Sequence, residues 1–192
     1  MFYNIVKSIV GIILKPFYPI QVHGIENISS NGKLLLCSNH VSKLDPILIT
    51  IGFPRQINWM AKSELFKNKI LSFIITKLKA FPVNRKETDI NAIKNALRVL
   101  KKNEVLGIFP EGTRVKEFNL KNAKSGAALI SLRSRAPILP VYIEEDYKMF
   151  TKVNIYIGKP IRYYETFNKK VSPEDYKFIS EDLLKRIYSL KI

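Results

Sequence analysis

The sequence predicts an α/β protein in which a central mixed or mostly parallel sheet is flanked by helices. Two observations lead to this prediction. Short β-rich runs alternate along the chain with segments of helical periodicity. No repeat, low-complexity tract or linker interrupts the 192 residues, and the apolar share of 46% and charged share of 25% are those of an ordinary globular chain. We therefore expect one folded domain over residues 21–192, preceded by a separate helix in residues 1–20.

The N-terminal segment reads as an amphipathic helix that ends at Pro16 and Pro19. Its narrow polar stripe consists of Asn4, Lys7, Ser8, Gly11 and Lys15, and its broad apolar face of Phe2, Ile5, Val6, Ile9, Ile12 and Ile13. Lysines divide the apolar run, and about 20 apolar residues are needed to span a bilayer. The pattern predicts a helix lying in a membrane interface. A helix packed on the protein's own core is the alternative.

The remaining elements follow from residue type and spacing. We expect strands at Leu34–Ser38, Ile57–Ala61, Val105–Phe109, Ile138–Ile143 and Val153–Ile157. A helix over Asp89–Lys102 would bury Ile90, Ile93, Leu97 and Leu100, and a short Ala-rich helix follows over Lys124–Arg133. The last helix begins with Ser172 as N-cap and Pro173 at its first position, and its core face is Tyr176, Ile179, Leu183, Ile187 and Leu190.

The charge is strongly basic, with 32 Lys and Arg against 16 Asp and Glu, a net charge of +16. Such a surplus predicts a polyanionic partner, either nucleic acid or an anionic membrane surface. From Lys62 to Lys102 there are eleven basic residues and three acids. The bulky side chains of Phe66–Lys79 are mostly aliphatic, whereas a nucleic-acid platform needs exposed aromatics or Arg. Lipid is the favoured partner, and a nucleic-acid-binding module the competing one.

Two polar clusters follow predicted strands, where ligands of α/β sheets gather. The first contains His40 and Asp45. Asp45 before Pro46 reads as a helix N-cap, which requires the chain to turn and lets the carboxylate reach the imidazole. A histidine held by a carboxylate at one nitrogen keeps the other free to take a proton. The alternatives are a simple cap and a hydrogen-bonded turn histidine.

The second cluster, Phe109–Arg114, contains a Pro/Gly turn followed by an arginine that can bind phosphate. The alternative is a surface turn with no ligand. Arg85 stands at another strand end. Cys37 lies within a predicted apolar strand, which indicates a small buried hydrophobic residue. Because the chain has one cysteine, an intrachain disulfide is excluded. Two histidines are too few for a His-rich metal site.

Four blocks together resemble the glycerolipid acyltransferase family, whose best-known members are the 1-acylglycerol-3-phosphate acyltransferases. They are NHVSKLD (Asn39–Asp45), FPVNR (Phe81–Arg85), FPEGTR (Phe109–Arg114) and PILPVYI (Pro137–Ile143), in the family's order and at similar spacing. The resemblance covers roughly residues 20–160. Asn84 departs from it, since many members carry Asp there, and the chain is short for the family.

The resemblance implies transfer of a fatty acyl group from acyl-CoA or acyl carrier protein to the free hydroxyl of lysophosphatidate, for phospholipid synthesis. His40 would be the general base and Asp45 would orient it. Lys62 is the candidate oxyanion donor, with backbone amides near His40 as the alternative. Glycerol 3-phosphate or another lysolipid is the alternative acceptor, and hydrolysis alone would indicate a thioesterase.

The other site residues implied by the resemblance serve the acceptor. Arg85 and Arg114 would bind its phosphate, and Glu111, Gly112 and Thr113 would shape that pocket. We expect neither a metal nor a cofactor. The enzyme would work at the cytoplasmic face of the cell membrane, attached peripherally or monotopically.

Overall fold

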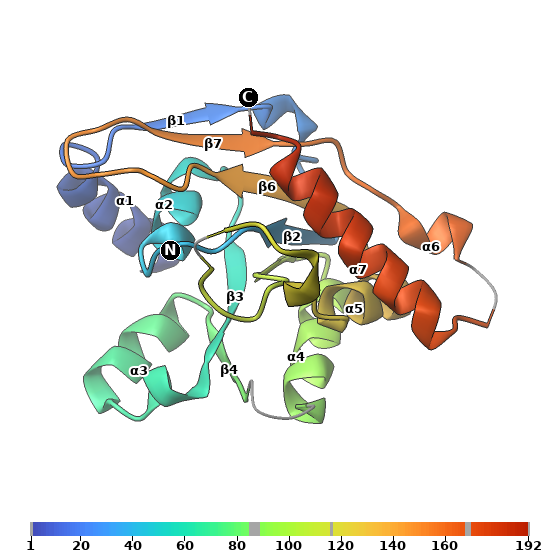
Figure 1. Ribbon diagram of the computed structural model, residues 1–192. Helices are drawn as coiled ribbons and strands as arrows, with labels where there is room; N and C mark the ends of the chain where they lie inside the picture. The colour runs from blue at the N-terminus through green and yellow to red at the C-terminus, as the bar shows by residue number, and fades with distance from the viewer. Residues whose placement is uncertain (1, 85–88, 116, 168–169, 192) are drawn as a thin grey trace.

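The computed structural model describes residues 2–84, 89–115, 117–167 and 170–191. Within them the chain forms a seven-stranded sheet in the order β1-β7-β6-β2-β5-β3-β4 (Figure 1). All paired strands are parallel except β6 and β7, so the predicted mixed, mostly parallel sheet is confirmed. The strands are β1 (Ile20–His23), β2 (Leu34–Ser38), β3 (Ile57–Lys62), β4 (Phe81–Val83), β5 (Val105–Ile108), β6 (Ile138–Ile143) and β7 (Val153–Ile157).

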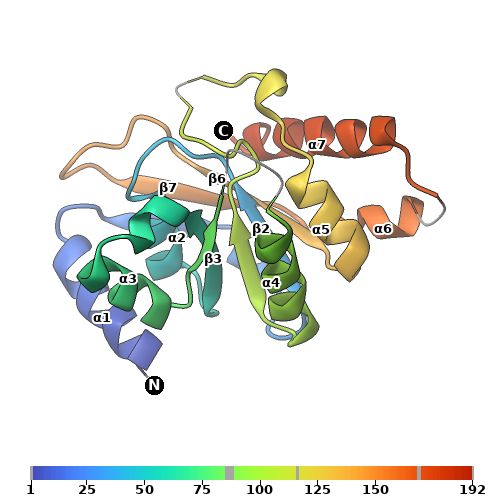
Figure 2. The ribbon, with the colours of Figure 1, turned by 90° about the horizontal axis from the view of Figure 1, so that it is seen from below.

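Helices cover both faces of the sheet (Figures 1 and 2). The α-helices are α1 (Phe2–Leu14), α2 (Asp45–Gly52), α3 (Lys69–Lys77), α4 (Ile90–Lys101), α5 (Gly126–Ser134), α6 (Tyr163–Thr166) and α7 (Pro173–Tyr188). Short 3-10 turns stand at Ile25–Asn27, Ser63–Phe66 and Leu120–Asn122.

The central strand β2 shows how the two layers of core arise. Successive side chains of a strand point to opposite faces. Leu35 and Cys37 pack with α4, α5 and α7 in one core cluster, whereas Leu34 and Leu36 pack with α2 in the other. All five residues of β2 are buried, which fits a strand covered by helices on both sides.

The predicted helix starts are mostly confirmed. Ser172 and Asp175 form a capping box at α7, with Pro173 at its start, and Asp89 accepts a hydrogen bond from the amide of Ala92 at α4. The predicted core face of α4 is wrong in part. Ile90 is 63% exposed, and Ala92, Ala96 and Leu100 form the buried face, because small side chains let the helix lie close to the sheet.

Helix α1 packs one side against α2 and leaves the other exposed. Tyr3 and Gly11 are buried, and Ile57 donates its backbone N–H to the Tyr3 hydroxyl at 3.1 Å. Of the predicted polar stripe, Gly11 and Lys7 face the protein, whereas Asn4, Ser8 and Lys15 are exposed. The Lys7 ammonium donates to the carbonyl of Phe53. Burial lowers the pKa of Lys7. The exposed side carries Phe2, Ile5, Ile9, Ile12 and Ile13.

A second exposed apolar surface lies on α3. Ile70 is 76% exposed and Phe73 61%, and none of the side chains of α3 is buried. The lysine Lys77 lies 5.5 Å from the centroid of the Phe73 ring. Among the described residues, no helix combines the length and the apolar character needed to span a bilayer.

Candidate active site

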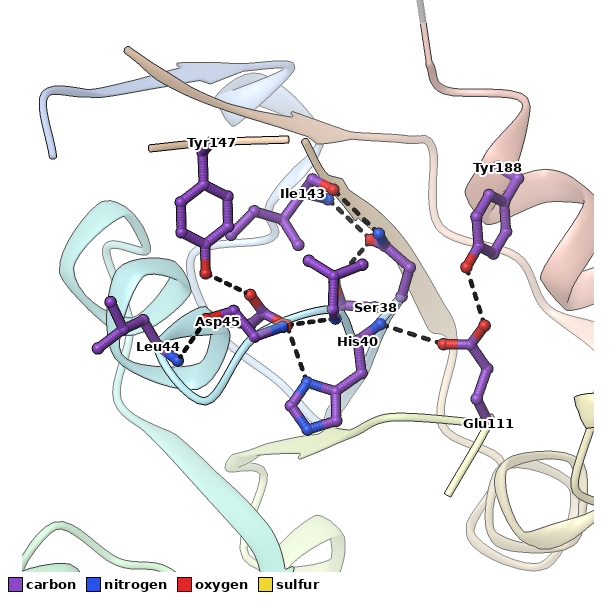
Figure 3. Close-up of polar contacts among 11 residues, drawn as sticks. Ser38, His40, Leu44, Asp45, Glu111, Ile143, Tyr147 and Tyr188 are labelled. Atoms are coloured by element: carbon purple, nitrogen blue, oxygen red, sulfur yellow. Dashed lines mark hydrogen bonds and ion pairs between the residues drawn. The ribbon is translucent and has the colours of Figure 1, made fainter. Parts of the chain in front are cut away.

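The site lies at the edge of the sheet where β2, β5 and β6 end. These strands are neighbours and parallel, so their carboxyl ends meet. His40 follows β2, and the loop after it folds back so that Asp45, the first residue of α2, faces the imidazole. Asp45 Oδ2 lies 2.8 Å from His40 Nδ1 (Figure 3). The predicted histidine–carboxylate contact is present.

Asp45 does not act as the predicted N-cap. The cap position belongs to Leu44, and no side chain caps α2. The carboxylate instead turns back to the preceding loop, where Oδ2 accepts the backbone N–H groups of Val41 at 2.7 Å and Ser42 at 2.8 Å. Asp45 is fully buried. A buried carboxylate is costly unless it is hydrogen-bonded, and these donors meet that need while fixing the loop.

The second oxygen of this carboxylate is held from another part of the chain. The Tyr147 hydroxyl donates to Asp45 Oδ1 at 2.7 Å (Figure 3). Burial raises the pKa of Tyr147, with a further contribution from Asp45, so the phenol keeps its proton and serves as donor. Both oxygens of Asp45 are thus fixed, and with them the orientation of His40.

The imidazole is also held by aromatic packing. The His40 ring stacks on Phe109, with centroids 3.9 Å apart and planes 15° from parallel, and Phe109 stacks on Trp59 at 5.0 Å. Trp59 in turn donates to Thr50 Oγ1 at 2.9 Å. Figure 3 shows the second ring nitrogen of His40, Nε2, on the side away from Asp45. A ring fixed in this way presents Nε2 in one orientation.

Glu111 joins the loop of His40 to the C-terminal helix. Its Oε2 accepts the backbone N–H of His40 at 3.1 Å, and its Oε1 accepts the Tyr188 hydroxyl at 2.8 Å (Figure 3). Only 1% of the side chain is exposed, and burial raises the pKa of Glu111 to about 7. The sequence predicts Glu111 as part of a substrate pocket, and the structure places it beneath the loop that it supports.

Asn39 ties the same loop to β6. Its side-chain amide donates to the carbonyl of Ile143 at 2.9 Å, and its oxygen accepts the Ile143 N–H at 2.8 Å. The Asn39 side chain is fully buried, so this pair of hydrogen bonds between loop and strand is shielded from water. The first residue of the NHVSKLD block is accordingly a positioning residue.

The turn that carries Arg114 begins at Phe109, whose carbonyl accepts the N–H of Gly112 at 3.0 Å. Gly112 has a φ of 70°, in the left-handed region that favours glycine. The loop then returns to the histidine, because Val115 donates its N–H to the His40 carbonyl at 2.8 Å. Thr113 and Arg114 are exposed beside this contact. The structure brings this turn to the edge of the site.

Lys62 and Cys37 lie outside this network. Lys62, the last residue of β3, is half-exposed and pairs with Glu64 at 3.1 Å, so the structure does not draw it into the network around His40. Arg85 lies outside the described residues. Cys37 is fully buried, and burial raises the pKa of its thiol, as expected of a hydrophobic core residue. Across the part of the chain that is described, no group of three or more His, Cys, Asp or Glu side chains could hold a metal ion.

Comparison with known proteins agrees with the resemblance seen in the sequence. The family model described as Acyltransferase matches residues 19–144, more than half of the chain. This range contains His40, Asp45 and the Phe109–Arg114 turn. The chain belongs to this acyltransferase family.

Related acyltransferases match over most of the chain. The 1-acyl-sn-glycerol-3-phosphate acyltransferase of Bacillus subtilis is 31% identical over 98% of this chain and 96% of its own length. The Streptococcus pneumoniae protein of the same name is 32% identical over 73% of this chain and 53% of its own. The crystal structure of the 1-acyl-sn-glycerophosphate acyltransferase PlsC from Thermotoga maritima superposes with a TM-score of 0.72 at 26% identity, covering 98% of this chain and 79% of that one.

The site of this acyltransferase also contains residues that its sequence does not single out. Tyr147 and Tyr188 reach Asp45 and Glu111 across 102 and 77 residues of sequence. No local spacing indicates such contacts. Asn39 and Phe109 belong to two of the four sequence blocks that resemble the family, and these blocks could have indicated them as site residues. Trp59 belongs to none of the four blocks.

Proposed function

We propose that this acyltransferase moves a fatty acyl group from acyl-CoA or acyl carrier protein to the sn-2 hydroxyl of 1-acylglycerol 3-phosphate, giving phosphatidate. The observation that supports this most directly is the His40–Asp45 pair. Its carboxylate is buried and held at both oxygens, and its imidazole is fixed by stacking with Nε2 away from Asp45. Such a pair is a general base for an alcohol.

In the proposed reaction, His40 Nε2 removes the proton of the acceptor hydroxyl as the oxygen forms a bond with the thioester carbonyl carbon. Asp45 accepts the Nδ1 proton in a hydrogen bond and stabilises the imidazolium that forms. The carbon–sulfur bond then breaks, and the thiolate leaves with the proton that His40 returns. The oxygen ester and the free thiol are the products, with no covalent enzyme intermediate.

The tetrahedral intermediate requires a donor for its oxyanion. The backbone N–H groups of His40, Val41 and Ser42 are engaged by Glu111 and Asp45, which weakens the case for amides at this loop. Lys62 is the donor that we propose. It can serve only if its ammonium leaves Glu64, and its exposure leaves the side chain free to turn.

For the acceptor, we propose that its phosphate binds Arg114, together with Arg85. Arg114 stands on the turn that is bonded to the His40 carbonyl through Val115, so a phosphate there would hold the glycerol hydroxyl close to the base. Guanidinium groups bind phosphate through two hydrogen bonds, which favours a phosphorylated acceptor over a neutral one. Gly112 and Thr113 would form the floor of this phosphate site.

We propose further that the protein works on an anionic membrane surface, at the cytoplasmic face of the cell membrane. Two apolar surfaces support this, the exposed side of α1 and the side chains of α3. Helices α1 and α3, which carry these side chains, lie toward the same side of the molecule (Figures 1 and 2). The net charge of +16 supplies attraction to anionic lipids, at about 1 kcal/mol for each basic residue near the surface.

The deciding experiment offers the purified protein a labelled acyl-CoA or acyl carrier protein with a panel of acceptors. Lysophosphatidate, glycerol 3-phosphate, a neutral lysolipid and buffer alone form the panel. We expect labelled phosphatidate with lysophosphatidate and little product with the others. Product from glycerol 3-phosphate alone would replace the proposed acceptor, and acceptor-independent release of fatty acid would replace transfer by hydrolysis.

A further inference from the structure

The hairpin between β6 and β7 ends in a short apolar tip between two lysines. Met149 is 55% exposed and Phe150 is 69% exposed, and the exposed Lys148 and Lys152 flank the tip. The turn is closed by Thr151, whose Oγ1 accepts the Lys148 N–H at 2.8 Å and donates to the Lys148 carbonyl at 2.7 Å. The two apolar side chains are thus held outward on a closed turn.

This tip is continuous with the end of α1. The Phe150 N–H donates to the Phe17 carbonyl at 2.6 Å, and the two rings lie 5.5 Å apart. Phe17 is itself 38% exposed and follows α1 in the sequence. Ile12 and Ile13 are the last residues on the exposed apolar side of that helix. Lys15 lies between Ile13 and Phe17 in the sequence and is also exposed. The tip and α1 therefore form one apolar surface.

The backbone at Phe150 adds a second indication. Its φ is 65°, a left-handed conformation that is unfavourable for a residue with a Cβ. Residues in such conformations persist where the surroundings hold them, often at functional positions. Here the residue is a phenylalanine whose ring is mostly exposed, and the closed turn and the hydrogen bond to Phe17 hold its backbone in this conformation.

We infer that the tip of the β6–β7 hairpin, residues 148–152, inserts Met149 and Phe150 into the surface of an anionic bilayer. This inference rests on the proposed function at a membrane. Three lysines, Lys15, Lys148 and Lys152, surround the apolar side chains and match anionic headgroups. The nearby acid Asp146 is exposed at the base of the hairpin. A second copy of this chain would bring like charges together.

The tip would also set where the site stands. Tyr147, which precedes the tip directly, donates to Asp45 and packs edge-on against Tyr18, the residue after Phe17. Insertion of residues 149–150 would thus hold Asp45 and His40 at the bilayer surface. A lysolipid acceptor could then present its hydroxyl without leaving the membrane.

The test places a tryptophan at the tip. Phe150→Trp is compared with Phe178→Trp, a matched control because Phe178 is 59% exposed. It belongs to α7, which lies on the other side of the molecule from the hairpin between β6 and β7 (Figure 1). The native Trp59 is 7% exposed and gives a constant background. On phosphatidylglycerol vesicles, emission of Trp at 150 should shift to the blue and be quenched by brominated acyl chains. Trp at 178 should show neither change.

Vesicle sedimentation and sedimentation velocity complete the test. The double variant Met149→Ser, Phe150→Ser should bind phosphatidylglycerol vesicles about tenfold more weakly than the Phe178→Ser control. If the wild type sediments with vesicles while Trp at 150 stays unquenched, the inference fails and the membrane function stands. If the wild type ignores the vesicles, both fail. Loss of a dimer in the double variant would assign the tip to self-association and overturn the inference.

Discussion

Asp45 Oδ2 lies 2.8 Å from His40 Nδ1, five residues earlier in the sequence, and the same oxygen accepts two backbone N–H groups of the intervening loop. On a straight helix, positions five apart differ by about 140° and cannot meet in this way. The contact depends on the turn before α2. One carboxylate therefore fixes both the loop and the orientation of the imidazole.

The first prediction concerns the base. His40→Ala should lower acyl transfer by about 10²–10⁴-fold, because proton removal from the acceptor hydroxyl is lost. The matched control is His23→Ala, since His23 is bonded to Asn154 and stacked on Tyr156, away from the site. Turnover of both variants and their thermal unfolding should be measured. Transfer by the His40 variant within tenfold of the wild type would remove its assignment as base.

The second prediction concerns the orientation of the carboxylate. Tyr147→Phe removes the hydroxyl that donates to Asp45 Oδ1 and leaves the ring in place. A hydrogen bond to a charged group contributes about 1.5–3 kcal/mol, so kcat should fall by about tenfold or more. The KM values for both substrates should change little, because Tyr147 acts through Asp45. Tyr18→Phe is the control in the same aromatic contact.

The two outcomes for Tyr147 are separable by kinetics. A loss of stability without a change in kcat would make Tyr147 a structural residue only. A rise in KM for the acceptor at constant kcat would mean that the hydroxyl contacts substrate instead of orienting the base.

The main strands could be predicted from sequence, because buried strands are continuous apolar runs. The predicted bounds of β2, β6 and β7 are those observed. Strand β1 was not predicted. It is a four-residue edge strand, and edge strands are short and carry a weak pattern. Strand β4, the other edge strand, is only three residues long and contains Pro82, which lacks the N–H that a ladder uses.

Some residues of the site could likewise be predicted from the sequence, and others could not. His40, Asp45 and Glu111 follow strands that are neighbours in the sheet, so strand ends and family blocks were enough to indicate them. The bonds of Tyr147 and Tyr188 depend on the path of the hairpin and of α7, which no local pattern encodes. The side of α4 that is buried was misjudged because helix periodicity weighs Ile90 above Ala92 and Ala96, whereas close packing selects the small residues.

The third prediction concerns the proposed phosphate site. Arg114→Ala should raise the KM for lysophosphatidate by about 10- to 100-fold, since a hydrogen bond to a charged group is worth about 1.5–3 kcal/mol. The KM for the acyl thioester should stay the same. Arg133→Ala, an exposed arginine on α5, is the control. A rise in the thioester KM alone would assign Arg114 to the donor.

The fourth prediction concerns the two apolar surfaces. Because Tyr3 is buried against β3, deleting α1 would disturb the fold, and single substitutions on its exposed side are the better probe. Ile12→Glu and Ile70→Glu should each weaken binding to phosphatidylglycerol vesicles about tenfold, through lost apolar contact and charge repulsion. Ile90→Glu on α4 changes an equally apolar, 63% exposed residue and should bind like the wild type. Equal binding by all three variants would contradict a membrane role for α1 and α3.

The last prediction follows from the buried carboxyl of Glu111. Burial raises its pKa from 4.5 to about 7, so between these values the folded state binds more protons than the unfolded state. The free energy of unfolding must then fall as pH rises through this window, by about 3 kcal/mol in all from 1.36 kcal/mol for each pKa unit. The Gln side chain of the Glu111→Gln variant stays neutral and keeps an oxygen for the His40 N–H. The free energy of unfolding of this variant should therefore not fall for this reason.

Other carboxyl groups also titrate, so the difference between wild type and Glu111→Gln is the quantity to measure. Chemical denaturation of both proteins across the window from pH 4.5 to above pH 7 gives it. The two should be about equally stable at the acid end, and the Gln variant should be the more stable above pH 7, where Glu111 is ionised. Parallel pH profiles would show that the Glu111 carboxyl titrates alike in the folded and unfolded chain. Its bonds to His40 and Tyr188 would then hold the loop without any dependence on pH.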